Sequence, residues 1–491
     1  MDIKSSACPL DCPDLCGLSV TVDHGRVVKV EGDHRSPFTN GVICGKVRKI
    51  ADHLYGKDRV LHPMLRRGPK GTGEWEPISW DAALDLVVEK MSRRGGEAIL
   101  PYHYGGSNGW LTDGALAERF WRRMKTTILD KTYCSAAATE ASRGLYGKMP
   151  GVALEDYEHA KLIVLLGVNP SATGIHLVPV IKRARALGAK LVVIDPRMTP
   201  LAHGADMYLP IKPGTDLPVA LAIVNALFER GHADHVFLAA YCDGVEELRA
   251  RASAWSVEAA AREAQIPVED LERLIDLYVT SSPAVLRPGY GIERNRNGGS
   301  AVAAIIAIPA VAGKFGVRGG GFTMSNGDAR WTVSSDAMVA EPEHTARHVN
   351  MSGIAEALET LRDPPIDVMY VYNCNPASTA PDQRRLIEQL RREDLFVIVH
   401  DQVWTDTAQL ADLVLPATSF LEHREVRRGY GNMRMYDSPA VIDPVGESRS
   451  NNQVFAALLD RFGLVREGEA LTDEELVTET FKPNPELRAE L

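Results

Sequence analysis

The feature that most constrains the fold of this chain is an internal repeat with a constant offset. The segment Leu-Ile-Val-Leu-Leu-Gly-Val-Asn-Pro, which begins at Leu162, has a counterpart in Val-Met-Tyr-Val-Tyr-Asn-Cys-Asn-Pro, which begins at Val368, so that the residue numbers of the two copies differ by 206. The same offset, without a gap, joins further pairs: Val193 and Val399, Asp195 and Asp401, Thr199 and Thr405, Ala202 and Ala408, Ala205 and Ala411, Asp206 and Asp412, Leu209 and Leu415, and Pro210 and Pro416. Chance explains hydrophobic matches more easily than Asn-Pro, Asp and Thr in one register. We therefore expect two homologous units.

Each copy of the repeat alternates short apolar runs with an amphipathic segment. Residues 162–167 and 191–195 are Leu-rich or β-branched runs bounded by Gly, Pro, Asn or Asp, and residues 177–187 predict a helix between them. Such βαβ units build parallel sheets that are covered on both faces. The sequence therefore predicts an α/β fold with two doubly wound units. Before them, Ser79 is the expected N-cap of an amphipathic helix.

Polar residues follow the predicted strands in both copies. In doubly wound sheets, ligands bind at the carboxyl ends of the strands, where Asn169, Asp195, Asn375 and Asp401 fall. Two equivalent sites indicate two similar ligands, or one ligand with two similar halves. Neither copy has a GxGxxG turn, so a standard NAD site is not indicated. The alternative is that these Asn and Asp residues only cap helices.

Four of the seven cysteines lie close to the N-terminus, at Cys8, Cys12, Cys16 and Cys44. Thiolates are soft ligands that suit iron–sulfur clusters, and three close ligands with one remote ligand is a recurrent arrangement. Structural zinc and buried free thiols are the alternatives, although zinc sites more often use two close pairs. Alternating residues around a His24-Gly25 turn predict a β-hairpin over residues 18–32, so this domain should be rich in strands.

Composition excludes several classes of protein. The formal net charge is −10 and no basic stripe is apparent, which argues against nucleic acid as a partner. A membrane-spanning helix needs about 18 consecutive apolar residues or more, and no run in this sequence approaches that length, so no span is expected. The N-terminal residues have neither an apolar core nor a twin-arginine pair, which predicts a cytoplasmic location.

Several short motifs occur together in one order along the chain. They are Cys8-Pro-Leu-Asp-Cys-Pro-Asp-Leu-Cys-Gly17, Gly41-Val-Ile-Cys-Gly-Lys46, Ile78-Ser-Trp-Asp-Ala-Ala83, Gly167-Val-Asn-Pro170, Val193-Ile-Asp-Pro-Arg197, Lys212-Pro-Gly-Thr-Asp216 and Ala411-Asp-Leu-Val-Leu-Pro-Ala417. Through this set, from residue 8 to about residue 460, the chain resembles the molybdenum or tungsten bis-pterin-guanine-dinucleotide oxidoreductases. That family includes formate dehydrogenases, nitrate reductases and polysulfide reductases.

The resemblance implies a division of the chain into domains. Residues 1–62 would form a β-rich [4Fe–4S] domain. Residues 106–324 would form a Rossmann-like domain for the first nucleotide arm of the cofactor. Residues 63–105 with 325–465 would form a discontinuous, homologous domain for the second arm. Residues 466–491 read as an acidic tail, and the C-terminal β-barrel domain usual in the family is expected to be absent.

The resemblance also implies roles for residues. Cys8, Cys12, Cys16 and Cys44 would ligate the cluster, and Lys46 would lie between the cluster and a pterin. Cys134 would ligate molybdenum or tungsten, with Ser135 as the alternative ligand. The expected nucleotide contacts are Asn169, Asp195, Arg197, Asp216, Asn375 and Asp401. The glycines at Gly289, Gly291 and Gly319–Gly321 would either permit close approach to a flat cofactor or form a mobile loop.

The function that follows from the resemblance is an enzyme. Its [4Fe–4S] cluster and Mo- or W-bis(pterin guanine dinucleotide) would pass electrons to or from a small substrate. The expected partner is an electron-transfer subunit or a polypeptide that supplies the missing C-terminal domain; alternatively, the sequence is truncated or cofactor binding is impaired. Ser135 stands where formate dehydrogenases carry His, which disfavours formate. Two alternatives remain at this point. One is an inactive iron–sulfur electron-transfer or scaffold subunit, and the other is a non-redox hydratase on the same cofactor.

Overall fold

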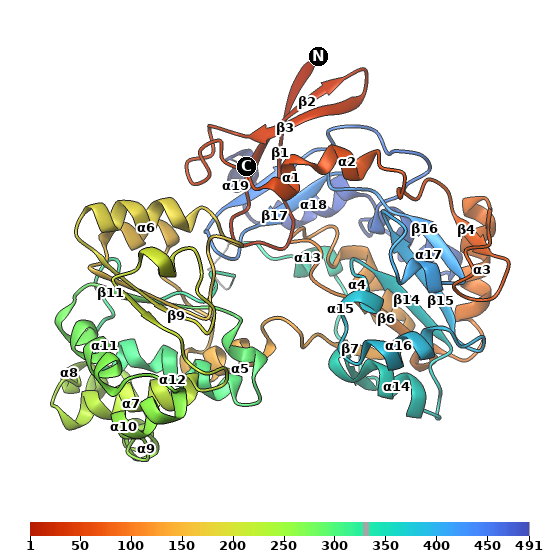
Figure 1. Ribbon diagram of the computed structural model, residues 1–491. Coiled ribbons are helices and arrows are strands. Elements are labelled where there is room, and N and C mark those ends of the chain that lie inside the picture. Colours follow the sequence, from red (N-terminus) through yellow and green to blue (C-terminus); the bar gives the residue numbers. More distant parts are fainter. Residues whose placement is uncertain (328–332, 491) are drawn as a thin grey trace.

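The computed structural model describes residues 1–327 and 333–490, which form a mixed α/β fold with several sheets (Figure 1). At the N-terminus, β1 (Asp2–Ala7), β2 (Gly17–Asp23) and β3 (Arg26–Gly32) form an antiparallel sheet. The predicted hairpin is confirmed, because β2 and β3 pair across His24 and Gly25, which both have positive φ. Two short helices follow, α1 (Gly45–Arg48) and α2 (Ile50–Leu54).

The first copy of the repeat lies in a five-stranded parallel sheet. Its order is β10 (Met207–Leu209), β9 (Lys190–Ile194), β8 (Leu162–Leu166), β11 (Ala284–Pro288) and β12 (Gly321–Phe322). One face packs on α6 (Leu177–Ala186), and the other on α7 (Asp216–Glu229) and α12 (Gly298–Val311). Around them lie α5 (Ala136–Tyr146), α8 (His235–Tyr241), α9 (Val245–Ala252), α10 (Val257–Ala264) and α11 (Val268–Thr280). The predicted strands and helix of this copy are therefore present.

The second copy lies in a six-stranded mixed sheet. Its order is β5 (Trp75–Pro77), β4 (Met64–Arg66), β16 (Leu413–Pro416), β15 (Phe396–Asp401), β14 (Val368–Tyr372) and β6 (Ile99–His103). One face is covered by α3 (Trp80–Met91), α4 (Ala115–Met124) and α17 (Asn451–Arg461), and the other by α14 (Ile354–Thr360) and α16 (Gln383–Leu390). The Ser79 hydroxyl accepts from the Ala82 amide at 3.2 Å, which confirms the predicted N-cap of α3.

The sequence repeat is also a repeat of structure. Strands β14, β15 and β16 follow β8, β9 and β10 at the constant offset of the repeat, and each triplet is parallel in the same spatial order. The fourth strand breaks the correspondence. β11 follows its copy in the sequence, whereas β6 comes long before the second copy, ahead of the whole first copy, and still pairs with β14 in parallel.

The two sheets lie in separate lobes, and the N-terminal sheet lies above them at the same end as the C-terminal helices (Figure 1). These helices are α18 (Asp473–Phe481) and α19 (Pro485–Glu490), and Leu476, Val477 and Phe481 pack into the core that contains α4. Helix α4 and β7 (Ile128–Asp130) lie with the second sheet, beyond the predicted boundary at residue 106. Phe120 explains the placement of α4, because its ring packs against Phe455. The domain boundaries stay a prediction.

Smaller elements complete the described chain. They are α13 (Asp336–Val339), β13 (His348–Asn350), α15 (Pro376–Thr379), β17 (Glu425–Arg428) and β18 (Met435–Ser438). Among the helices of residues 1–327 and 333–490, none is long and apolar enough to cross a bilayer.

Candidate functional site

The four N-terminal cysteines come together at the base of the β1–β2 sheet. Cys8, Cys12 and Cys16 lie on the loop between β1 and β2, which is closed by a hydrogen bond from the Cys8 amide to the Cys16 carbonyl at 2.8 Å. Cys44 is the N-cap residue of α1. Burial raises the pKa of the Cys8 thiol to about 12 and that of Cys12 to about 11, and the neighbouring cysteines add to both shifts. These cysteines are therefore protonated on their own, and a positively charged metal core would stabilise their thiolate forms.

The four cysteines supply the donor set of an iron–sulfur cluster, because thiolates are the ligands that hold such clusters. A zinc ion would need four ligands at about 2.0–2.3 Å, whereas a four-iron cluster puts each thiolate on a different iron. The residues present thus fit a [4Fe–4S] core.

A buried histidine–aspartate hydrogen bond ties the cysteine loop to the helix that packs on the first sheet. His176, at the start of α6, places Nδ1 2.7 Å from the carboxylate of Asp14 and 4.0 Å from Cys16 Sγ. Its Nε2 lies 3.0 Å from the Val42 carbonyl oxygen. Both side chains of the pair are almost fully buried. The loop that carries the cysteines is therefore held on a rigid lobe.

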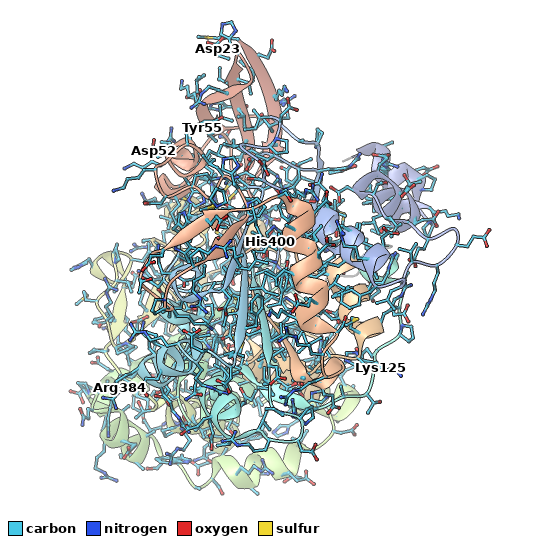
Figure 2. The ribbon with its side chains drawn as sticks, turned by 90° about the vertical axis from the view of Figure 1, so that its right-hand side faces the viewer. Asp23, Asp52, Tyr55, Lys125, Arg384 and His400 are labelled. Atoms are coloured by element: carbon cyan, nitrogen blue, oxygen red, sulfur yellow. The ribbon has the colours of Figure 1, made fainter. Side chains whose placement is uncertain are left out.

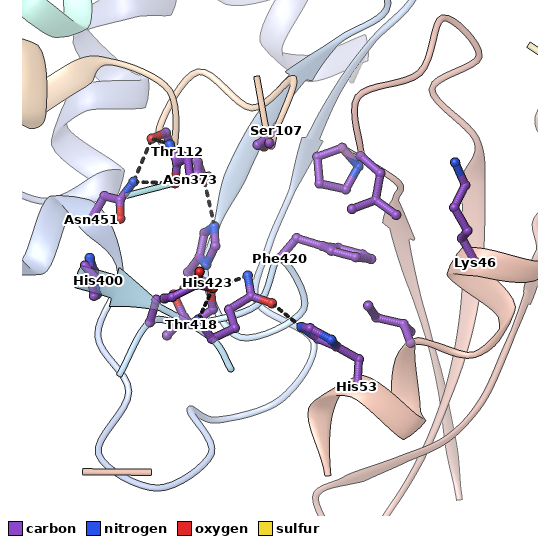
Figure 3. A pocket seen from close by; sticks show the side chains of 17 residues that line it. Lys46, His53, Ser107, Thr112, Asn373, His400, Thr418, Phe420, His423 and Asn451 are labelled. Atoms are coloured by element: carbon purple, nitrogen blue, oxygen red, sulfur yellow. Dashed lines mark hydrogen bonds between the residues drawn. The ribbon is translucent and has the colours of Figure 1, made fainter. Parts of the chain in front are cut away.

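Lys46, two residues after Cys44, lines a cavity of about 370 Å³ (Figure 3). Its side chain, from α1, is exposed and lines that cavity together with Phe420 and His423. The opposite wall holds His400 and Asp401 at the end of β15. Figure 2 places His400 in the middle of the molecule, far from the peripheral Asp23 and Arg384. The cavity thus joins the cysteine loop to the carboxyl edge of the second sheet.

The cavity has a polar network on its inner wall. His423 Nδ1 lies 2.8 Å from the Thr418 hydroxyl, and its Nε2 lies 3.1 Å from the Thr112 hydroxyl. Burial raises the pKa of Asp401 to about 6, although the Gln402 amide donates to its carboxylate at 2.6 Å. A partly buried carboxylate on a cavity wall is suited to a ligand edge with two N–H donors, such as guanine.

Asn375, a predicted nucleotide contact, uses its side chain for hydrogen bonds within the protein. Its side-chain oxygen accepts from the Thr407 amide at 3.1 Å and from the Thr407 hydroxyl at 2.6 Å. Its amide nitrogen donates to the Ser378 hydroxyl at 3.0 Å. The side chain therefore holds the loop after β14 against the loop after β15, which favours the structural alternative for this residue.

The contacts predicted for the first copy gather at the carboxyl edge of the first sheet. Burial raises the pKa of Asp216, the first residue of α7, to about 6, and the nearby charge of Asp195 adds to that shift. The Asp195 carboxylate accepts from the Arg197 amide at 2.8 Å, while the Arg197 side chain points to solvent. Asn169 accepts from the Ser171 amide at 3.2 Å. This group and Asp401 lie in different lobes, so they form two sites rather than one.

Cys134 stands between the lobes, on the loop that joins β7 to α5. Its amide donates to the Tyr104 hydroxyl at 2.9 Å, and its carbonyl accepts from Arg294 at 2.7 Å. Burial, with the charge of Asp11, raises the pKa of its thiol. Ser135 is the N-cap residue of α5, without a side-chain hydrogen bond to the helix. Cys374, in contrast, points its thiol at the Tyr102 carbonyl at 3.6 Å and lies among apolar residues.

Two residues near Cys134 were missed by the sequence reasoning. Asp11, inside the cysteine motif, has a pKa raised by desolvation and by Asp113, and its electrostatic neighbours include Lys46. Tyr104 follows β6, a strand that the repeat does not contain. The only signal for Asp11 was its place between Cys8 and Cys12. No local pattern distinguishes Tyr104.

The glycines after β11 have a structural explanation. A Cβ on Gly289 would lie 2.4 Å from the Gly167 carbonyl oxygen, and a Cβ on Gly291 would lie 2.8 Å from it. These glycines therefore allow two chain segments to approach at the end of the first sheet. Gly319 likewise packs against the backbone of Ala160.

The comparisons with known proteins agree with this arrangement. The family model described as molybdopterin oxidoreductase matches residues 59–461, and the model described as molybdopterin oxidoreductase Fe4S4 domain matches residues 1–56. The chain is 37% identical to the probable oxidoreductase YoaE of Bacillus subtilis (strain 168), over 99% of this chain and 72% of that protein. It is 26% identical to dimethyl sulfoxide/trimethylamine N-oxide reductase of Rhodobacter capsulatus, over 93% of this chain and 63% of that protein.

A solved structure supports the fold. Acetylene hydratase from Pelobacter acetylenicus superposes with a TM-score of 0.83 at 22% sequence identity, over 98% of this chain and 72% of that protein. At this identity the likeness concerns the fold alone.

Proposed function

Because the chain belongs to the molybdopterin oxidoreductase family, we propose that this enzyme passes electrons between a small substrate and its [4Fe–4S] cluster, by way of a Mo- or W-bis(pterin guanine dinucleotide). The family carries both cofactors, and when bound, the metal–pterin group supplies the two-electron chemistry at the substrate. The single observation that supports the proposal best is the position of Lys46. It lines a cavity that runs from the cysteine loop to Asp401.

Different residues of the chain would bind the cluster and the two nucleotide arms. Cys8, Cys12, Cys16 and Cys44 would hold the cluster. The carboxylate of Asp401 would accept from one guanine, and the pair Asp195 and Asp216 would accept from the other. Asn169 and Arg197 would contact the first nucleotide. Asn375 is the weakest of the proposed contacts, because Thr407 already occupies its oxygen.

Cys134 is the proposed protein ligand to the metal. The Tyr104 hydroxyl and Arg294 hold its backbone amide and carbonyl, so that its main chain keeps one position between the lobes. A thiolate suits a soft metal held by sulfur ligands. Because the pKa of its thiol is raised, this cysteine would lose its proton when it binds the metal rather than before.

The electron path would be short. Lys46 lies on α1, which begins directly after Cys44, and a cation beside the cluster would stabilise its reduced state. Electrons would then leave to a separate electron-transfer protein. Two relatives are named as parts of larger enzymes, the catalytic subunit of assimilatory nitrate reductase and subunit alpha of a formate dehydrogenase. The predicted cytoplasmic location stays a prediction.

A substrate panel tests the proposal. Anaerobically purified protein, with reduced viologen as the electron donor, should oxidise the dye when given an S-oxide, an N-oxide or nitrate. With oxidised viologen as the electron acceptor instead, formate should fail as a donor because Ser135 replaces a proton-handling His. A protein that contains iron without molybdenum or tungsten, and that oxidises no dye, would instead favour the scaffold-subunit alternative. Hydration of an alkyne without dye oxidation would favour the hydratase alternative.

A further inference from the structure

Arg427 is a fully buried arginine that faces the cysteine loop. It lies on β17, and none of its surface is exposed. Its guanidinium donates to the Ser6 hydroxyl at 3.1 Å, to the Ala7 carbonyl, and to the Phe420 carbonyl at 2.8 Å. Its Nε has no acceptor among the described residues. All of these partners are neutral.

Among the described residues, no carboxylate lies within ion-pair distance of Arg427. The two nearest in electrostatic terms are Glu425 and Asp437, and both serve other donors. Glu425 accepts from the Leu111 amide at 2.7 Å and from the Thr112 amide at 3.0 Å. Asp437 is paired with Arg424 and Arg488. Arg427 therefore lacks a direct counter-ion in the described part of the protein.

A buried charge without a partner is expensive, so an anion is expected beside it. Burial lowers the pKa of Arg427, but only to about 10, which leaves it protonated at neutral pH. The acceptor carbonyl of Ala7 belongs to the residue before Cys8. Arg427 thus contacts the residue next to a proposed cluster ligand, and the cluster is the anion expected beside it.

We propose that Arg427 is the buried counter-cation of the iron–sulfur cluster and raises its reduction potential. The inference rests on the proposed ligation of that cluster by Cys8. Reduction adds one electron and hence one negative charge to the cluster, while Arg427 keeps its charge. A fixed cation in a low-dielectric interior favours the more negative state. Arg427 acts through the cluster and touches no substrate, so its role is to tune the potential.

The test is an anaerobic redox titration of the cluster, followed by electron paramagnetic resonance, in three variants. Arg427→Gln removes the charge and keeps hydrogen-bonding groups. It should lower the ratio of reduced to oxidised cluster at a fixed potential by about tenfold or more, which for a one-electron couple is a shift of about 59 mV. Arg427→Lys keeps the charge and should restore most of the shift. Arg424→Gln removes a neighbouring arginine that is paired with Asp437 and Glu474, and should leave the potential unchanged.

An unchanged potential in Arg427→Gln would overturn the inference, as would equal shifts in Arg427→Gln and Arg427→Lys. If Arg427→Gln binds no cluster, the result for Arg427→Lys tests the inference. A cluster in Arg427→Lys with a reduction potential near that of the parent protein supports the role of Arg427 as a counter-cation. Loss of the cluster from both variants contradicts that role. A parent protein that shows no cluster signal would overturn the proposed function as well, whereas a parent signal with no response to Arg427→Gln would overturn this inference alone.

Discussion

Asp206 and Asp412, which occupy equivalent positions in the two copies of the repeat, make the same hydrogen bond in the two sheets. Asp206 accepts from the Leu191 amide at 2.9 Å, and Asp412 accepts from the Val397 amide at 2.8 Å, so each carboxylate ties its loop to the start of the neighbouring strand. The repeat therefore preserves structural residues as well as those at the strand ends.

Because these two carboxylates have different surroundings, their substitution should lower the free energy of unfolding by different amounts. Asp412 is buried and lies 2.9 Å from the buried Lys70 ammonium, whereas Asp206 pairs with the exposed Lys190. Asp412→Asn leaves Lys70 without its counter-ion and should lower the free energy of unfolding by about 3 kcal/mol. Asp206→Asn should cost about 1 kcal/mol. Urea unfolding measures both, and equal losses would contradict this reading of the repeat.

Asp401 should make the pterin-free protein less stable as the pH rises. Burial raises its folded pKa to about 6, while the unfolded value is about 3.9. Below about pH 4 the Asp401 carboxyl is protonated in the folded and the unfolded protein, so it does not lower the free energy of unfolding. Above about pH 6 the folded protein carries a disfavoured charge, with a cost of up to about 3 kcal/mol. Asp401→Asn should therefore raise the melting temperature of the pterin-free protein at pH 7–8 but not near pH 4.

Asp206→Asn is the matched control for that measurement. Although partial burial opposes the effect, the Leu191 amide and Lys190 lower the pKa of Asp206, so its contribution to stability is present at neutral pH and is lost as the pH falls. The two substitutions should shift the melting temperature at pH 7–8 in opposite directions. If Asp401→Asn is destabilising at pH 8, Asp401 is a structural residue rather than a ligand contact.

Cys12→Ala should remove the cluster and weaken the fold of residues 1–60, because a site of this kind is completed by its metal. Loss of bound iron and of the visible absorbance band measures the first effect, and faster proteolysis of the N-terminal sheet measures the second. Cys242→Ala is the control, since Cys242 lies by α8 in the first lobe, away from the cysteine loop. Full iron content in Cys12→Ala would contradict the ligand assignment.

His176 and Asp14 should be strongly coupled. Because the pair is buried, His176→Ala or Asp14→Ala alone leaves an unpaired group, and each should lower the free energy of unfolding by about 3 kcal/mol. The double variant should lose clearly less than the sum. Additive losses in a double-mutant cycle would show that the pair does not join the cysteine loop to α6.

Features with a local signal were predictable from the sequence. Ser79 indicates the start of a helix, and the repeat locates the strands from Leu162 and Val368 together with the carboxylates at their ends. Contacts that depend on distant segments were not. Strand β6 completes the second sheet from outside the repeat, and Arg427 contacts Ala7 from the opposite end of the chain. Asn375 illustrates a different limit, because a residue at a strand end suits a ligand and a loop bridge equally well by sequence.

Cys134→Ala separates the metal site from the cluster. The substitution should abolish dye oxidation by every substrate of the panel and leave the iron content unchanged, because Cys134, on the loop before α5, is not among the four proposed cluster ligands. Cys374→Ala, at a neighbouring buried thiol that points to a backbone carbonyl, is the control and should retain turnover. Turnover that survives Cys134→Ala would make Cys134 a structural residue.

The most direct test of the central claim is the content of the anaerobically purified protein. We expect about four iron atoms per chain, about one molybdenum or tungsten atom per chain, and GMP released by acid hydrolysis. Iron at this level with neither molybdenum, tungsten nor GMP would contradict it.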